Sequence, residues 1–229
     1  KGKVQMADKT KNKPEEYKPQ HPMEHIYVDV AAVNDKDSCN GVRYIVCIRE
    51  APGQLRGFYA VKKLKDAAKS LREFLKEHMP HVADRGAFEK RKLQIKPDGD
   101  RGAFGPEFEK AAADFGYVVN ASLPSHPDEN QAEWSVNEVK RMATTLLEHN
   151  HLPRETFPLV LRYISQIACI RPSSTHDGKS PYEYVTGGKK IKFKELIPFG
   201  NFGWKPKAKQ ERTALGWRGK PMMFLAWDS

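Results

Sequence analysis

The fold is decided by three short stretches, which read HIYVDVAAV (25–33), VRYIVCIR (42–49) and LRGFYAVKKL (55–64). Each of them is rich in the β-branched and aromatic residues that favour a strand. The segments between them, NDKDSCNG (34–41) and APG (51–53), contain the residues that form tight turns. Because short turns join strands that lie side by side, the three stretches predict an antiparallel meander.

Beyond residue 64 the apolar residues mostly recur with the spacing of helices, and short strands separate these helices. Helices are predicted at 67–79, 106–115, 131–148 and 156–170, and strands at 93–97 and 117–121. Asp66 is predicted to cap the first of these helices, and Gly116 to end the second. The order β-β-β-α-β-α-β-α-α predicts an α/β fold, in which helices cover both faces of a five-stranded mixed sheet.

The chain has 229 residues and a formal net charge of +10, from 39 Lys and Arg against 29 Asp and Glu. Residues 21–188 are balanced, with 23 basic and 23 acidic residues, so the excess belongs to the two flanks. A basic excess indicates a polyanionic partner, although a charged flank can equally be a solvated tail. Three cysteines without paired spacing exclude a disulfide scaffold and indicate a reducing compartment. No run approaches the ~18 apolar residues of a membrane span, so no membrane partner is expected.

Composition divides the chain into three parts. Residues 1–22 have few large apolar side chains and are typical of a basic linker. Residues 23–188 hold the predicted strands and helices and form the expected core. Residues 189–229 are again basic, but six Phe and Trp residues fall within 196–229, which is too many for a simple tail. This basic, aromatic extension is predicted to be the start of a small β module.

Four acidic residues stand at positions that are unusual for a structural role. Asp29 lies inside an apolar strand, Asp98 and Asp100 directly follow the fourth strand, and Glu133 lies in the first turn of a helix. If the first and fourth strands are neighbours, these carboxylates converge at one edge of the sheet. Clustered carboxylates repel one another unless cations lie between them, and oxygen ligands favour Mg²⁺ or Mn²⁺ over zinc. Each acid alone also has an ordinary explanation, as a strand-edge residue, a turn residue or a helix-dipole partner.

Several segments, taken in order, match landmarks of one protein family. They are MEHIYVD (23–29), 43–48 with 58–64, DGDRGAFGPEF (98–108), HPDENQAE (126–133), SPYE (180–183) and PFG (198–200). Over roughly residues 23–200 the chain resembles the catalytic core of retroviral-type integrases, and among these the copia-type branch of LTR retrotransposons. The resemblance implies an RNase H-like fold, which agrees with the strand order above.

The resemblance also implies a set of catalytic residues, in which Asp29, Asp98 and Glu133 hold two Mg²⁺ (or Mn²⁺) ions. The spacing to Glu133 favours Asp98 as the second acid, whereas the D-x-G pattern favours Asp100, and both remain candidates. Two such ions lower the pKa of an attacking hydroxyl and stabilise the leaving oxygen in phosphodiester transfer. No zinc site is expected, because the His and Cys residues lack the spacing of zinc ligands.

The implied activity is DNA integration by a polynucleotidyl transferase, with 3′-end processing followed by strand transfer of retrotransposon DNA into target DNA. Asn137 and Lys140 follow Glu133 by about one and two helical turns, so they share its face and are candidates for nucleic-acid binding. A solvated helix face is the alternative explanation for Lys140. Further candidates for phosphate contacts are Lys205, Lys207 and Lys209 in the basic extension. The expected partners are double-stranded DNA and further copies of the chain in a homo-oligomer, in the nucleus after a cytoplasmic-particle stage.

Two departures from the family pattern keep other functions open. Gln131 stands where the family has a glycine before the final acid, and Trp134 stands where a basic residue is usual. One alternative is therefore an inactive, domesticated core that acts as a nucleic-acid-binding or protein-interaction module. A second alternative is an RNase H-fold nuclease, which would use the same carboxylates without joining DNA. The landmarks at 180–183 and 198–200 favour the integrase.

Overall fold

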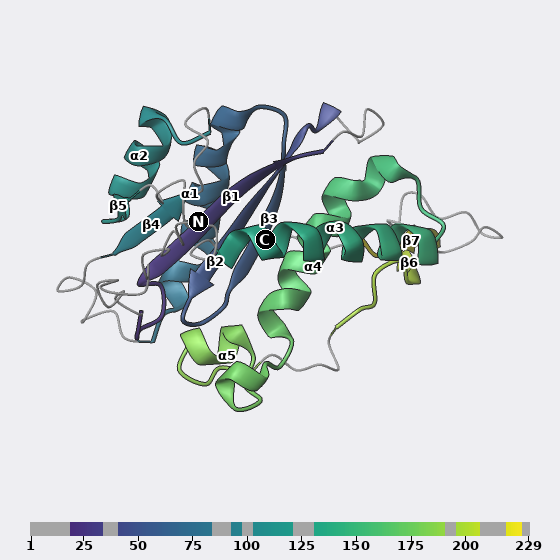
Figure 1. The fold of residues 1–229 in the computed structure, drawn as a ribbon. Coiled ribbons are helices and arrows are strands. Elements are labelled where there is room, and N and C mark those ends of the chain that lie inside the picture. The colour runs from purple at the N-terminus through teal and green to yellow at the C-terminus, as the bar shows by residue number, and fades with distance from the viewer. Residues whose placement is uncertain are drawn as a thin grey trace, which may run out of the picture.

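The computed structural model is built around a five-stranded sheet with the strand order β3-β2-β1-β4-β5 (Figure 1). It describes residues 19–33, 41–83, 93–97, 103–120, 131–190, 196–206 and 219–225, without the side chains of 131–134, 204–206 and 221.

The sheet is mixed, as the sequence predicts. Its antiparallel part comprises β1 (His25–Ala32), β2 (Tyr44–Ala51) and β3 (Arg56–Val61), which form the meander. β4 (Gln94–Pro97) joins β1 in parallel, and β5 (Val118–Val119) joins β4 in parallel. Because parallel neighbours need a crossover, helices connect β3 to β4 and β4 to β5.

The helices are α1 (Ala67–His78), α2 (Pro106–Ala113), α3 (Gln131–His149), α4 (Phe157–Ile170) and α5 (Pro181–Val185). The first four lie where the apolar periodicity predicts them. α5 is too short to show a period, and its local signal is a capping box. The Ser180 hydroxyl accepts the N–H of Glu183, and the Glu183 carboxylate accepts the N–H of Ser180.

Each side of the sheet is covered by its own pair of helices. Val28 of β1 belongs to the side that packs on α1 and α2, where Phe74 and Phe108 are buried. The opposite side carries Cys47 of β2 and is covered by α3 and α4, through buried residues such as Val139. In Figure 1 these two helices lie in front of the sheet. The prediction of helices on both faces is therefore confirmed.

Two local predictions are wrong in detail. Asp66 stands at the N-cap position of α1, but its Oδ2 accepts the N–H of Lys63 (3.1 Å) instead of an N–H of the helix. A 3₁₀ turn over Leu64–Asp66 precedes the helix and uses that carboxylate at its own start. β5 has two residues instead of five. Tyr117, predicted within it, is buried, and its hydroxyl donates to the Met23 carbonyl (2.6 Å).

The C-terminal extension contains a second, two-stranded antiparallel sheet of β6 (Phe202–Pro206) and β7 (Gly219–Met223). Just before it, Phe199 is buried, with its ring 5.2 Å from that of Tyr163 on α4. The extension thus holds β structure, while the domain boundaries at residues 22 and 188 stay predictions. No helix in the described part of the chain is long and apolar enough to cross a membrane.

Candidate active site

The centre of the candidate site is Asp29 on β1. Its carboxylate is half-buried, and its Oδ1 accepts the backbone N–H of Val30 (2.7 Å). Full burial of a carboxylate would be costly. Partial exposure of the side chain removes most of that cost.

The strand beside Asp29 is the one that precedes the next candidate acids. β4 runs parallel to β1, and the last pair of their register joins Val28 to Pro97. Asp29 is the next residue on β1, and Asp98 is the next residue of the chain after β4. The condition that the first and fourth strands are neighbours is therefore met. Asp98 and Asp100 themselves lie outside the described residues, so their convergence on Asp29 stays a prediction.

The buried thiol of Cys47 shows which side of the sheet Asp29 faces. Asp29 and Cys47 are directly opposite each other in the β1–β2 ladder, so their side chains share one face. Burial raises the pKa of the Cys47 thiol well above its ordinary range, and the nearby Asp29 carboxylate raises it further. The charge of Lys140 on α3 lowers the pKa of the same thiol. Asp29 therefore faces the side of the sheet that is covered by α3, the helix that carries Lys140.

Helix α3 carries three of the other predicted residues. Glu133 lies in its first turn, where the backbone is described and the side chain is not. Asn137 and Lys140 are exposed on the turns that follow. Seven residues at ~1.5 Å each place Lys140 about 10 Å beyond Glu133 along the helix axis. Among the described residues, no three His, Cys, Asp or Glu side chains lie close enough together to hold a metal ion.

The donor chemistry at this position nevertheless fits a hard cation. The Asp29 carboxylate is partly exposed one residue past the β1–β4 ladder, and the neighbouring parallel strand leads directly into Asp98. Carboxylate oxygens are the ligands that Mg²⁺ and Mn²⁺ prefer. Of the four candidate acids, only Asp29 has a described side chain, so a shared metal site stays a prediction.

A row of cations next to Asp29 was not predicted from the sequence. Tyr27 pairs with Arg49, and Arg49 pairs with Arg56, so the three side chains cross the sheet on the face that carries Asp29. Lys96 of β4 pairs with Tyr27 and holds its ammonium 5.8 Å from the centre of the ring. Burial lowers the pKa of Arg49, and the Arg56 guanidinium lowers it further. The sequence alone does not predict this row, because it depends on which residues of neighbouring strands pair with each other.

One carboxylate of α3 joins this row. Arg56 Nη1 donates to Glu138 Oε2 at 2.5 Å, and only 14% and 12% of the two side chains are exposed. Arg56 itself is held on β3, whose Phe58 N–H donates to the Ser165 hydroxyl of α4 (2.8 Å). The ion pair therefore fixes α3, the helix whose first turn contains Glu133, to the sheet that carries Asp29.

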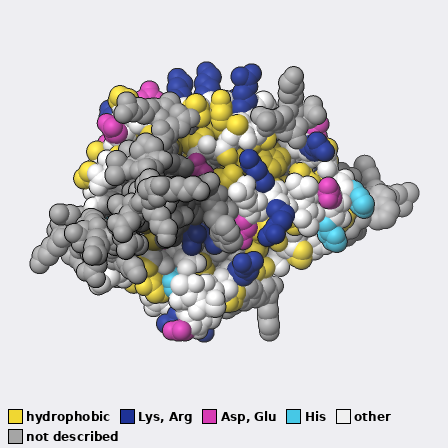
Figure 2. Space-filling model, in the orientation of Figure 1, with side chains coloured by type: hydrophobic (Ala, Val, Ile, Leu, Met, Phe, Trp, Pro, Cys, Tyr) yellow, Lys and Arg dark blue, Asp and Glu magenta, His cyan; other side chains and the backbone are white. Residues whose placement is uncertain are grey.

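The remaining predicted DNA contacts fall largely outside the described residues. Lys205 lies on β6, opposite Lys220 of β7, but its side chain is not described. Lys207 and Lys209 lie outside the described ranges. On the face that bears α3 and α4, Figure 2 shows a scatter of Lys and Arg side chains, in the same orientation as Figure 1.

No protein-family model and no curated protein matches the sequence. Solved structures do match the fold. One match is a chain of the cryo-EM structure of the simian T-cell lymphotropic virus intasome in complex with PP2A regulatory subunit B56 gamma. Its sequence is 14% identical, and the TM-score is 0.57. The match covers 90% of this chain and 70% of that one. The magnesium-bound integrase catalytic core domain of HTLV-2 matches in its trimeric form (11% identity) and its dimeric form (10%). Both have a TM-score of 0.50 and cover 72% of this chain and 97% of theirs. The chain therefore has the fold of retroviral integrase catalytic cores.

Proposed function

We propose that the chain is the catalytic core of an integrase of the copia-type LTR retrotransposon branch, and that it joins retrotransposon DNA to target DNA. The observation that carries the proposal is the position of Asp29. It lies at the end of the β1–β4 ladder, one residue past the last pair, on the side of the sheet that α3 covers. Under this proposal an acid from each of two strands and one from a helix start meet at this end of the ladder.

In this proposal Asp29, Asp98 (or Asp100) and Glu133 would hold two Mg²⁺ (or Mn²⁺) ions. When bound, such ions activate a water or 3′-hydroxyl and stabilise the leaving oxygen of a phosphodiester. The backbone N–H of Val30 orients the Asp29 carboxylate through its Oδ1. Lys140, exposed on α3, would contact a DNA phosphate next to the carboxylates. The basic extension, a homo-oligomer and a nuclear location belong to the same proposal.

A strand-transfer assay tests the proposal. Labelled duplexes with randomised terminal bases serve as donors and a plasmid as target, in Mg²⁺ or Mn²⁺. We expect joined product from the full chain and its loss, by at least ~100-fold, in Asp29→Asn and Glu133→Gln. Glu73→Gln is the matched control, because Glu73 is an exposed carboxylate on α1, on the opposite side of the sheet. Equal joining by all four proteins would contradict the proposal.

The sequence departures at Gln131 and Trp134 favour a second candidate, an inactive core that retains nucleic-acid or protein binding. Both residues flank Glu133 at the start of α3. Under this hypothesis the strand-transfer assay gives neither joining nor cleavage, while salt-sensitive DNA binding persists. Metal-dependent cleavage without joining would instead assign the chain to the nucleases of this fold.

A further inference from the structure

A groove runs between α3 and α4, on the same side of the sheet as Asp29. It consists of two adjoining hollows with volumes of about 190 and 340 Å³. Met142 of α3 and Ile164 and Ile167 of α4 line both of them, so the hollows form one continuous surface. The catalytic proposal uses none of these residues.

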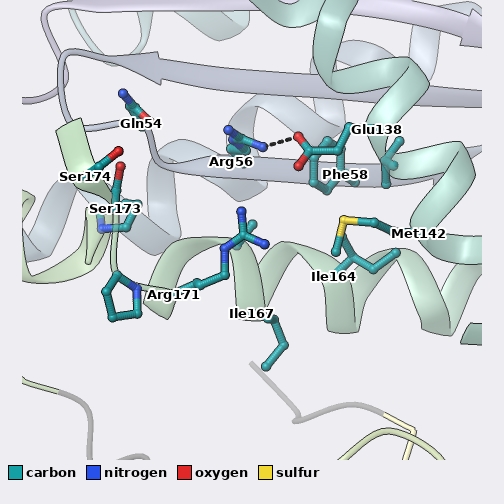
Figure 3. Close-up of a pocket in the computed structure, with 14 residues that line it drawn as sticks. Gln54, Arg56, Phe58, Glu138, Met142, Ile164, Ile167, Arg171, Ser173 and Ser174 are labelled. Atoms are coloured by element: carbon teal, nitrogen blue, oxygen red, sulfur yellow. Dashed lines mark hydrogen bonds and ion pairs between the residues drawn. The ribbon is translucent and has the colours of Figure 1, made fainter. Parts of the chain in front are cut away.

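One end of the groove is charged (Figure 3). Arg56 and Glu138 lie on one side as an ion pair, and Arg171, just after α4, extends its guanidinium toward them from the other side. Arg171 is exposed, and none of the other described residues makes a hydrogen bond or ion pair with its guanidinium. Two guanidiniums thus face one carboxylate, which leaves a net charge of +1 at this end of the groove.

The rim beside Arg171 is preformed. Pro172, Ser173 and Ser174 line the hollow between α4 and α5. The N–H groups of His176 and Gly178 both donate to the Ser173 carbonyl, at 3.2 and 3.0 Å, which fixes this loop. Two serine hydroxyl groups therefore stand next to Arg171 without a large ordering cost, and hydroxyls can donate to an anion.

The other end of the groove is apolar. Its lining is dominated by Leu146, Tyr163 and the three shared residues, with Arg141 and Thr145 at the edge. A phosphate backbone would gain from the cations at the first end but would leave this apolar surface uncovered. A peptide carries an acidic and an apolar side chain a short distance apart, and it matches both ends at once.

We propose that the α3–α4 groove binds a peptide segment of a partner protein, with an acidic side chain at Arg171 and Arg56 and an apolar side chain between Leu146 and Tyr163. Ala168 lines the charged end and Tyr163 the apolar end. These two residues are five apart on α4, or roughly 7–8 Å along its axis. An extended peptide spans that distance in about two to three residues. The segment therefore carries its apolar residue two or three positions from its acid.

Fluorescence polarisation with labelled synthetic peptides tests the inference on the full chain. Each peptide holds one Glu and one Leu, spaced two, three or four residues apart in a Gly/Ser background. One twin has Gln for Glu, and a second has Ser for Leu. We expect at least one spacing to bind about tenfold more tightly than both twins, because a charge-assisted hydrogen bond and a buried apolar side chain each contribute at least ~1.4 kcal/mol.

Two variants locate the binding site. Arg171→Glu changes an exposed residue and is expected to lower the affinity for the best-binding peptide at least ~10-fold. Ile167→Gln is also expected to lower this affinity. Lys76→Glu, on exposed α1 surface of the opposite side, is the control and is expected to leave affinity unchanged. Circular dichroism verifies that all variants are folded. This readout needs neither metal nor DNA joining, so it is independent of the proposed catalysis.

Three results would overturn the inference. The first is that no peptide binds better than its twins. The second is that duplex DNA displaces the peptides and that Arg171→Glu abolishes this DNA binding, which would assign the groove to nucleic acid. The third is that sedimentation shows self-association that Ile167→Gln abolishes while peptide affinity is unmeasurable, which would assign the groove to a second copy of the chain.

Discussion

Asp29 on β1 and Cys47 on β2 lie directly opposite each other on the face of the sheet beneath α3. The thiol is completely buried, whereas the carboxylate is partly exposed. This pair marks the boundary between the apolar core and the candidate site. It also links the site to α3, because Val139 of that helix belongs to the same buried cluster as Cys47.

Cys47 is expected to be chemically inert in the folded protein. Burial raises the pKa of its thiol, and the Asp29 carboxylate raises it further, so almost no thiolate forms near neutral pH. The thiolate is the reactive species. Burial likewise raises the pKa of Cys169 to about 12. Alkylation by iodoacetamide at pH 8, followed by mass spectrometry, should leave both residues unmodified until denaturant is added. Rapid labelling of Cys47 in the native protein would contradict this arrangement.

Glu50 is expected to make stability depend on pH. Its carboxylate is fully buried and accepts the N–H groups of Met23, Gly53 and Leu55, yet burial outweighs these bonds and raises its pKa from 4.5 to about 7. A group whose pKa is raised on folding contributes stability at low pH. That contribution, about 3 kcal/mol, is lost as the pH rises from about 4.5 to about 7.

Urea unfolding at several pH values measures this effect. Glu50→Gln is expected to reduce the fall in unfolding free energy between pH 4.5 and about 7. It is also expected to lower the unfolding free energy at every pH by ~1–3 kcal/mol, because an amide cannot accept all three N–H groups with the same geometry. Exposed Glu73→Gln serves as the control. Parallel pH profiles for the Glu50 variant and the unsubstituted protein would show that Glu50 does not cause the dependence.

The Arg56–Glu138 ion pair is expected to hold α3 in place. Removing one partner leaves a mostly buried charge without its counter-ion, so Arg56→Ala should lower the unfolding free energy by about 2–4 kcal/mol. The double change Arg56→Met with Glu138→Leu should cost less than the single one, since no charge is left behind. Lys69→Ala, which breaks the exposed Lys69–Glu73 pair, should change stability by less than ~0.5 kcal/mol. Equal costs for Arg56→Ala and Lys69→Ala in urea unfolding would disprove the structural role.

Lys140 is expected to contribute one phosphate contact if the chain binds DNA as proposed. Lys140→Ala should then reduce the slope of log K against log salt by about 0.9 for a duplex. Lys76→Ala, on the opposite side of the sheet, should leave that slope unchanged. Titration of a labelled duplex at several salt concentrations measures both. An unchanged slope in Lys140→Ala would support the solvated helix face instead.

The sequence predicts most of the architecture, because the meander and the four longer helices are specified by local patterns. The β-branched and aromatic residues of β1 and the apolar face of α3 are examples, and both elements lie where the patterns place them. What local pattern does not contain is register. The row that joins Tyr27, Arg49 and Arg56 depends on which residues pair across strands, and a slip of one residue would reverse every side chain.

Of the candidate site, the described residues show the arrangement of its strands and the side chain of Asp29. The site requires β1 and β4 to be neighbours, and they are, although the order of elements along the chain does not by itself specify which strands pair. The Arg56–Glu138 pair was missed because its partners are 82 residues apart and neither belongs to a motif. α5 was missed as a helix because five residues show no period, although its S-P-Y-E capping box was visible in the sequence.

Anomalous diffraction from crystals of the full chain grown with Mn²⁺ tests the central claim most directly, namely that Asp29 and Glu133 belong to one metal site. We predict Mn²⁺ peaks within about 2.0–2.6 Å of the Asp29 carboxylate, in a two-ion centre that Glu133 completes and whose ions lie roughly 3.5–4 Å apart. Asp29 and Glu133 carboxyl groups more than ~10 Å apart, with no Mn²⁺ at either, would contradict it.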